Sequence, residues 1–139
     1  MNGKTILVVD DEPPIRYMLE LKLGQAGFSI ITANNGQEAY KLACEHRPDL
    51  IVSDYQMPVM DGLEFCKQLA ADPETGGIPV VMLTARGHKV PPAELARTNI
   101  KCFLDKPFST RHLIVQIKEL LLLPSDESTS VDDVGLSAA

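Results

Sequence analysis

Residues 50–62 read LIVSDYQMPVMDG, and the interpretation of the whole chain starts from this stretch. It opens with a short, continuous apolar run, which is typical of a strand buried on both faces of a parallel sheet. The run ends in a carboxylate, Asp54, after which Pro58 and Gly62 favour a loop, because proline fixes its backbone and glycine permits positive φ. Ligands of open parallel sheets bind just outside the carboxyl ends of the strands. We therefore expect Asp54 to face solvent from a rigid strand, although an isolated Asp in this position more often only caps a turn.

Strand-like and helix-like segments alternate along the chain. Four further apolar runs are predicted strands, at residues 5–9, 28–33, 78–83 and 102–105. A segment with helical spacing or helix-capping residues follows each of the five strands. Of the two doubly wound topologies, the flavodoxin-like one fits five strands best. The sequence thus predicts an α/β fold with five helices around a five-stranded parallel sheet of strand order 2-1-3-4-5.

Length and composition fit one globular domain with an acidic end. We expect residues 1–123 to form the domain, while residues 124–139, rich in Ser, Asp and Ala without periodicity, indicate a disordered acidic tail or a linker. The net charge of -6 disfavours a nucleic-acid surface, and no apolar run is long enough to span a membrane. Three widely spaced cysteines, Cys44, Cys66 and Cys102, indicate reduced thiols in the cytoplasm rather than a disulfide framework or a zinc site.

Polar side chains stand at the ends of four predicted strands. Asp10 and Asp11 follow the first strand, Asp54 ends the third, Thr84 follows the fourth, and Lys106 follows the fifth. Clustered carboxylates resist ionising together without a cation, and oxygen ligands with room for water suit Mg²⁺. The lysine ammonium and the threonine hydroxyl suit the oxygens of a tetrahedral anion. Each residue alone has a plainer explanation, as a helix cap, an edge residue or a surface charge, but their coincidence at one edge of a sheet favours a site.

The chemistry that these groups support is attack of a carboxylate on a phosphoryl group. Asp54 is the predicted nucleophile, which gives an aspartyl-phosphate. Mg²⁺ and Lys106 then neutralise charge on the oxygens of the transferring group.

With these residues in view, the chain resembles the receiver domains of two-component response regulators, and its length is similar to that of the single-domain chemotaxis regulator. The resemblance covers residues from about 4 to 122. Five segments carry it: ILVVDDE at 6–12, VSDYQMP at 52–58, MDG at 60–62, LTA at 83–85 and KPF at 106–108.

The resemblance implies a role for each residue at the strand ends. Asp54 would accept a phosphoryl group from a phosphohistidine on a sensor histidine kinase or a histidine phosphotransfer protein. Mg²⁺ would be bound by Asp11, Asp54 and the backbone carbonyl of Gln56, with Asp10 acting through water. Lys106 would contact a phosphoryl oxygen, and its bond to Pro107 is expected to be cis.

The resemblance also implies a switch and its output. Thr84 and Phe103 would move together on phosphorylation and change the surface of the fourth helix, fifth strand and fifth helix. Gln56 and Arg86 would tune the lifetime of the phosphoryl group. The chain would not be an enzyme in the usual sense, and it would regulate an unknown output protein, either alone or as part of a longer chain, with a possible phosphorylation-dependent dimer. Pro91 and Pro92 predict a short or displaced fourth helix.

Two other functions were weighed. A haloacid-dehalogenase-like phosphatase also uses an aspartyl nucleophile but requires Asp-x-Asp after its first strand, whereas Asp10 has Glu12 two positions on. A flavodoxin-like binding module would need a phosphate-cradling loop there, and the acidic residues at 10–12 would repel phosphate. A degenerate receiver that signals by contact alone is the remaining alternative.

Overall fold

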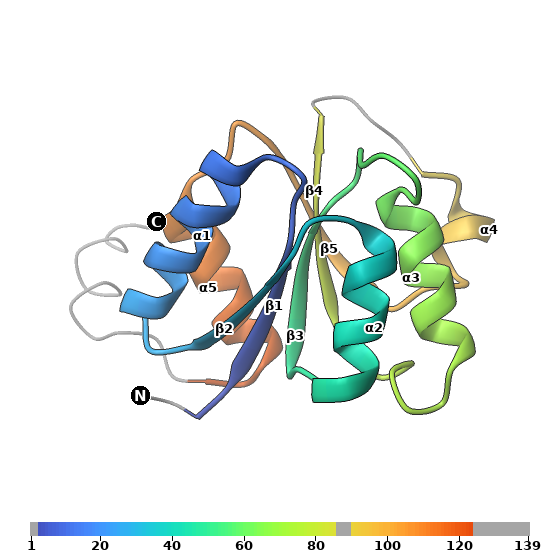
Figure 1. The fold of residues 1–139 in the computed structure, drawn as a ribbon, viewed down its shortest axis with the longest axis horizontal. Coiled ribbons are helices and arrows are strands. Elements are labelled where there is room, and N and C mark those ends of the chain that lie inside the picture. Colours follow the sequence, from blue (N-terminus) through green and yellow to red (C-terminus); the bar gives the residue numbers. More distant parts are fainter. Residues whose placement is uncertain (1–2, 86–89, 124–139) are drawn as a thin grey trace.

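The computed structural model describes residues 3–85 and 90–123, which form one sheet with helices on both sides (Figure 1). The five strands are β1 (Thr5–Val9), β2 (Ser29–Ala33), β3 (Leu50–Asp54), β4 (Val80–Ala85) and β5 (Ile100–Lys106). The five helices are α1 (Pro13–Gln25), α2 (Gly36–His46), α3 (Gly62–Ala71), α4 (Pro92–Leu95) and α5 (Thr110–Leu120).

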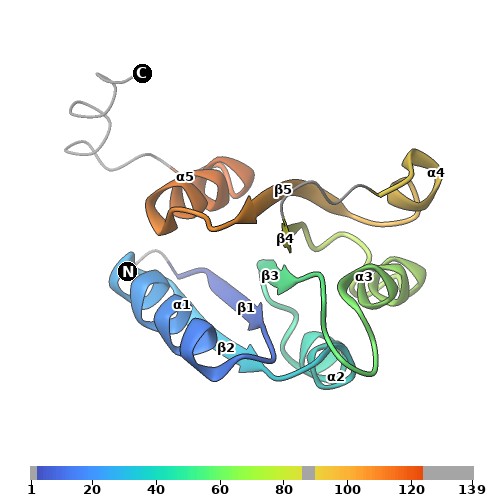
Figure 2. The same cartoon turned by 90° about the horizontal axis from the view of Figure 1, so that it is seen from above.

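All strand pairs are parallel, and the strand order is β2-β1-β3-β4-β5, as predicted. Figure 2 shows α1 and α5 on one face of the sheet and α2 and α3 on the other. No helix among residues 3–85 and 90–123 has both the length and the apolar character needed to cross a membrane.

The core has two halves because neighbouring residues of a strand point to opposite faces of the sheet. In β1, Ile6 and Val8 pack with residues of α1 and α5, whereas Leu7 and Val9 pack with residues of α2 and α3. Every residue of β3 is buried. The central strands therefore form a rigid base for the residues that follow them.

Most predicted boundaries hold to within two residues, and the end of α4 is the exception. β5 begins at Ile100 rather than Cys102, because Val80 pairs with Ile100 and Val81 with Cys102, so that Lys101 is an extra residue in the pairing. The predicted short helix at 91–98 is shorter still, at four residues. The predicted tail at 124–139 lies outside the described residues.

Side-chain caps fix where three helices begin, with Asp61 accepting from the N–H of Glu64 at the start of α3. The side chain of Asn35 accepts a hydrogen bond from the backbone N–H of Glu38 at the start of α2. Of the two candidate caps for α5, Ser109 makes the bond, to the N–H of His112.

Candidate phosphorylation site

The register of the sheet brings the polar strand ends together. Val9 pairs with Ser53, so Asp10 and Asp54 follow neighbouring positions on β1 and β3. Asp54 pairs in turn with Leu83, the residue before Thr84. On the outer pair of strands, Ala85 pairs with Lys106. Four of the predicted strand ends thus meet at one edge of the sheet.

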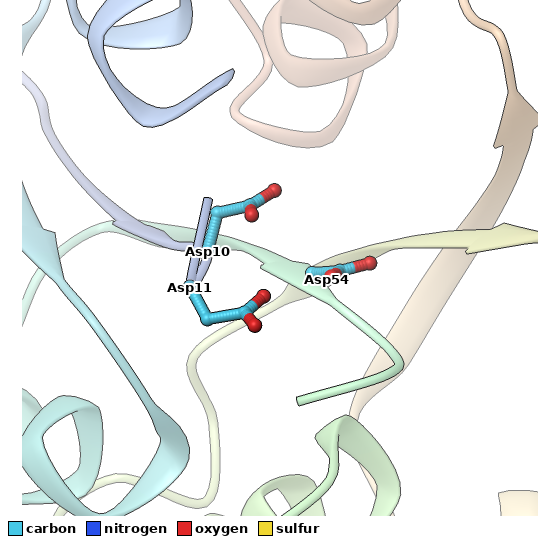
Figure 3. A group of neighbouring side chains, drawn as sticks. All are labelled: Asp10, Asp11 and Asp54. Atoms are coloured by element: carbon cyan, nitrogen blue, oxygen red, sulfur yellow. The ribbon is translucent and has the colours of Figure 1, made fainter. Parts of the chain in front are cut away.

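Three carboxylates form the acidic part of this edge. One oxygen from each of Asp10, Asp11 and Asp54 lies within 4.8 Å of the others, and Figure 3 shows the side chains projecting to the same side from the ends of β1 and β3. Asp10 and Asp54 are buried, whereas Asp11 is exposed. Asp54 therefore does not stand open to solvent as expected; only 4% of it is exposed.

Lys106 supplies the positive charge beside Asp54. Its Nζ lies 2.7 Å from Oδ1 of Asp54. Burial acts to lower the pKa of Lys106, but the hydrogen bond to Asp54 and the negative charges of Asp54, Asp10 and Glu12 outweigh it and raise the pKa. The ammonium is therefore held in its charged form next to the predicted nucleophile. The peptide bond between Lys106 and Pro107 is cis, as the resemblance implied.

Asp10 has a raised pKa and a buried oxygen without a hydrogen-bond partner among the described residues. Burial raises its pKa to about 6, opposed by a hydrogen bond that its Oδ1 accepts from the N–H of Glu12, while the charge of Asp54 raises it further. Its other oxygen, Oδ2, is buried and has no hydrogen-bond partner among the described residues. A buried carboxylate oxygen without a partner is costly. This oxygen and its two acidic neighbours fit the oxygen ligands that Mg²⁺ prefers.

The two predicted switch residues differ in burial and lie on the neighbouring strands β4 and β5. Thr84 is buried, and its hydroxyl donates a hydrogen bond to Oδ1 of Asp105 at 3.3 Å. Phe103 is 36% exposed on β5, the strand at the edge of the sheet. Of the two residues predicted to tune the phosphoryl lifetime, Gln56 is exposed next to Asp54, and Arg86 lies outside the described residues.

Contacts that the sequence did not predict also shape the site, two of them through Arg16 and Asp105, which were not singled out, and one through Gly62, which was predicted only to favour a loop. Arg16 donates from Nη1 to the backbone carbonyl of Asp10 at 2.8 Å and so holds the turn after β1. A Cβ added at Gly62 would lie 2.8 Å from the carbonyl oxygen of Asp54, so only glycine allows α3 to start this close to β3. The hydrogen bond between Thr84 and Asp105 depends on the pairing of β4 with β5, which places the two residues opposite one another. None of these contacts leaves a signal in the sequence beyond the residue type.

The loop between β3 and α3 is tightly turned. The N–H of Met60 donates to the carbonyl of Pro58 at 2.7 Å, and Val59 between them has a φ of 72°. Such a φ is rare for a β-branched residue. The loop is closed by the N–H of Gly62, which donates to the carbonyl of Tyr55 at 2.7 Å.

Comparison with known proteins places this chain in a family. The family model described as "Response regulator receiver domain" matches residues 6–118. The chain is 37% identical over 138 residues to the phosphate regulon transcriptional regulatory protein PhoB of Pseudomonas aeruginosa, covering 98% of this chain and 60% of PhoB. It is 39% identical to the alkaline phosphatase synthesis transcriptional regulatory protein PhoP of Bacillus subtilis, covering 86% of this chain and 49% of PhoP. The chain therefore spans about half the length of these regulators.

Solved structures show the same fold. Chemotaxis protein CheY4 of Vibrio cholerae superimposes with a TM-score of 0.75 at 34% identity, covering 84% of this chain and 97% of CheY4. The receiver domain of a sensor histidine kinase from Pseudomonas aeruginosa PAO1 superimposes with a TM-score of 0.75 at 26% identity, covering 84% of this chain and 96% of that one. That structure has a magnesium ion coordinated in its active-site cleft. The matches give no support to a haloacid-dehalogenase-like phosphatase. With the strand order, the acidic edge and these matches taken together, the chain belongs to the receiver-domain family of two-component response regulators.

Proposed function

We propose that Asp54 is the residue through which this receiver domain is switched by phosphorylation. One observation carries the proposal: Lys106 is 2.7 Å from Asp54 at an edge where three carboxylates meet. A carboxylate oxygen of Asp54 attacks the phosphorus of a phosphohistidine on a sensor histidine kinase or a histidine phosphotransfer protein. The P–N bond breaks, the imidazole leaves with the electron pair, and an aspartyl-phosphate remains. The domain is not an enzyme in the usual sense, and its reactions are this transfer and its own dephosphorylation.

The other site residues have defined parts in this proposal. Asp11, Asp54 and the backbone carbonyl of Gln56 would hold Mg²⁺, and Asp10 would act through water. Bound Mg²⁺ supplies positive charge next to the phosphoryl oxygens. Lys106 neutralises the charge of a phosphoryl oxygen. The hydroxyl of Thr84 gives up its hydrogen bond to Asp105 and donates to the phosphoryl group instead. The orphaned Oδ2 of Asp10 and the magnesium in the related kinase receiver support this assignment.

The change in Thr84 is passed to the surface that contains Phe103. We infer that this surface, made of α4, β5 and α5, meets an output protein or a second phosphorylated copy of the chain. Gln56, exposed beside Asp54, and Arg86 set the access of water and thus the lifetime of the phosphoryl group. A cytoplasmic location follows from the phosphohistidine donor and accords with the three free cysteines. The net charge of -6 accords with an output that does not contact nucleic acid directly.

The test is the intact mass of the protein after incubation with Mg²⁺ and acetyl phosphate. We expect one added phosphoryl group in the wild type, none in Asp54→Asn, and none when a chelator removes Mg²⁺. Asn keeps the size of the side chain and removes the nucleophilic charge, so a loss of labelling reports chemistry and not folding. Labelling of folded Asp54→Asn to the same extent as the wild type would contradict the assignment of Asp54.

A further inference from the structure

The helix α4 is held to the body of the domain by few interactions. Its four residues include none that is buried, and of these only Leu95 packs against the core among the described residues. Its side-chain link to another helix is an ion pair between Glu94 and Nζ of Lys67 on α3. These two side chains are 36% and 22% exposed, so the pair is partly shielded from water. Among the described residues, the ion pair and the packing of Leu95 are therefore the side-chain interactions that join α4 to the rest of the domain.

Lys67 lies on the helix that starts against the phosphorylation site. This helix is α3, whose first residue, Gly62, is packed against the carbonyl of Asp54. Burial raises the pKa of the Tyr55 hydroxyl and the charge of Asp61 raises it further, while the charge of Lys67 acts to lower it. On the other side, the ammonium lowers the pKa of Glu94 through their hydrogen bond. Lys67 thus joins the region next to Asp54 to α4.

The chain itself connects α4 with the switch residues. α4 lies between β4, which carries Thr84, and β5, which carries Phe103. In this structure the Thr84 hydroxyl is bound to Asp105, which is the arrangement before phosphorylation in the function proposed above. In the function proposed above, the movement of Thr84 toward a phosphoryl group is accompanied by a change in the surface that includes α4. Because α3 starts against the carbonyl of Asp54, a shift of α4 relative to α3 would change the separation of Glu94 from Lys67.

We infer that Lys67 is a positioning residue: its ion pair with Glu94 holds α4 in the unphosphorylated arrangement and so opposes phosphorylation of Asp54. The inference rests on the proposed function and adds how that site is restrained. A coupling of this kind needs two arrangements and an interaction that favours one of them. Here the interaction is the α3–α4 ion pair, which the unphosphorylated arrangement makes and the phosphorylated one loses.

The experiment measures the initial rate of phosphoryl incorporation from acetyl phosphate at fixed Mg²⁺, by intact mass over time. Glu94→Gln and Lys67→Gln each remove the pair, and partly exposed pairs of this kind correspond to rate increases of about two- to fivefold. The exchanged variant Lys67→Glu with Glu94→Lys rebuilds the pair in reverse and is expected to return the rate to that of the wild type. A purely structural role would lower stability without this recovery, so urea unfolding is measured on each variant.

Glu74→Gln is the matched control. It removes another ion pair, in which Oε1 of Glu74 lies 2.6 Å from Nη2 of Arg47, away from the site and from α4. Its labelling rate is expected to equal that of the wild type. The inference is overturned if the single variants are labelled at the same rate as a wild type that takes the phosphoryl group. It is also overturned if the labelling rate of the exchanged variant is raised by the product of the two single-variant increases. A wild type that takes no phosphoryl group, like Asp54→Asn, overturns the proposed function and this inference with it.

Discussion

At the scale of single residues, the main energetic conflict of the site lies in Asp10. Its carboxylate is fully buried, one oxygen has no partner among the described residues, and burial raises its pKa to about 6. Between the ordinary value of 3.8 and about 6, the folded protein holds a proton that the unfolded chain has lost. Stability from this group therefore falls as pH rises through this window, and at pH 7 the buried charge opposes folding.

Replacement of Asp10 by Asn is expected to stabilise the protein at pH 7 without Mg²⁺. Asn has no charge to bury, and its Oδ1 can still accept the hydrogen bond from Glu12. The rise of the pKa from 3.8 to about 6 corresponds to a gain of about 3 kcal/mol in the free energy of unfolding, and the gain is expected to vanish near pH 4. Urea unfolding across this pH range, with a chelator present, measures it. Asp11→Asn, at an exposed position, is the control, and an equal gain in both variants would contradict the assignment to burial of Asp10.

The residues of the site differ in how far the sequence could predict them. Asp10, Asp11, Asp54, Thr84 and Lys106 were predictable because each follows a recognisable apolar run, and the ends of parallel strands meet at one edge. The burial of Asp54 and the bond from Thr84 to Asp105 were not, since they depend on side-chain placement and on the pairing of β4 with β5. The role of Lys67 depends on where the short α4 lies, which no local pattern records.

At the scale of elements, β1 and β3 were the most predictable parts of the fold. Their apolar runs are buried from both sides, so burial alone specifies the strand. β5 was less predictable, because an edge strand is more exposed and its extra residue at Lys101 shifts the alternation of the side chains. α4 was predicted from the prolines at 91 and 92 to be short, and its length of four residues confirms this.

The loop between β3 and α3 stores backbone strain at Val59. This residue has a φ of 72° and is 85% exposed, so its side chain gains little from packing. An L-residue in the left-handed region costs about 1–2 kcal/mol, and glycine avoids that cost while losing about 0.5–1 kcal/mol through the freedom of the unfolded chain. Val59→Gly is therefore expected to raise the free energy of unfolding by about 0.5–1 kcal/mol.

Urea unfolding of Val59→Gly beside Val59→Ala separates strain from side-chain loss. Alanine removes most of the side chain but keeps the unfavourable φ, so its stability is expected to stay close to that of the wild type. A lower unfolding midpoint for the glycine variant than for the alanine variant would show that the turn is not strained. This loop also carries the backbone carbonyl of Gln56, a predicted Mg²⁺ ligand. An effect of either variant on phosphorylation is therefore measured separately from stability.

At the scale of the whole molecule, the acidic edge links cation binding to global stability. The site is built from the ends of β1 and β3, which lie at the centre of the sheet and unfold only with the rest of the domain. A cation that binds these carboxylates binds the folded state alone, so it stabilises the whole domain by mass action. At a Mg²⁺ concentration ten times the dissociation constant, the gain is about 1.4 kcal/mol.

Thermal or urea unfolding, measured in Mg²⁺ and in chelator, is expected to show this gain in stability for the wild type. Asp11→Asn is expected to lose the gain, because it removes a predicted ligand without disturbing the core. Asp10→Asn behaves differently, because it starts from a higher stability in chelator and has less repulsion for the cation to relieve. The wild type and Asp10→Asn should therefore approach one another as Mg²⁺ rises. If the wild type unfolds at the same midpoint in Mg²⁺ and in chelator, the acidic edge does not bind the cation. The charge of Lys106 alone would then have to offset the repulsion among the three carboxylates.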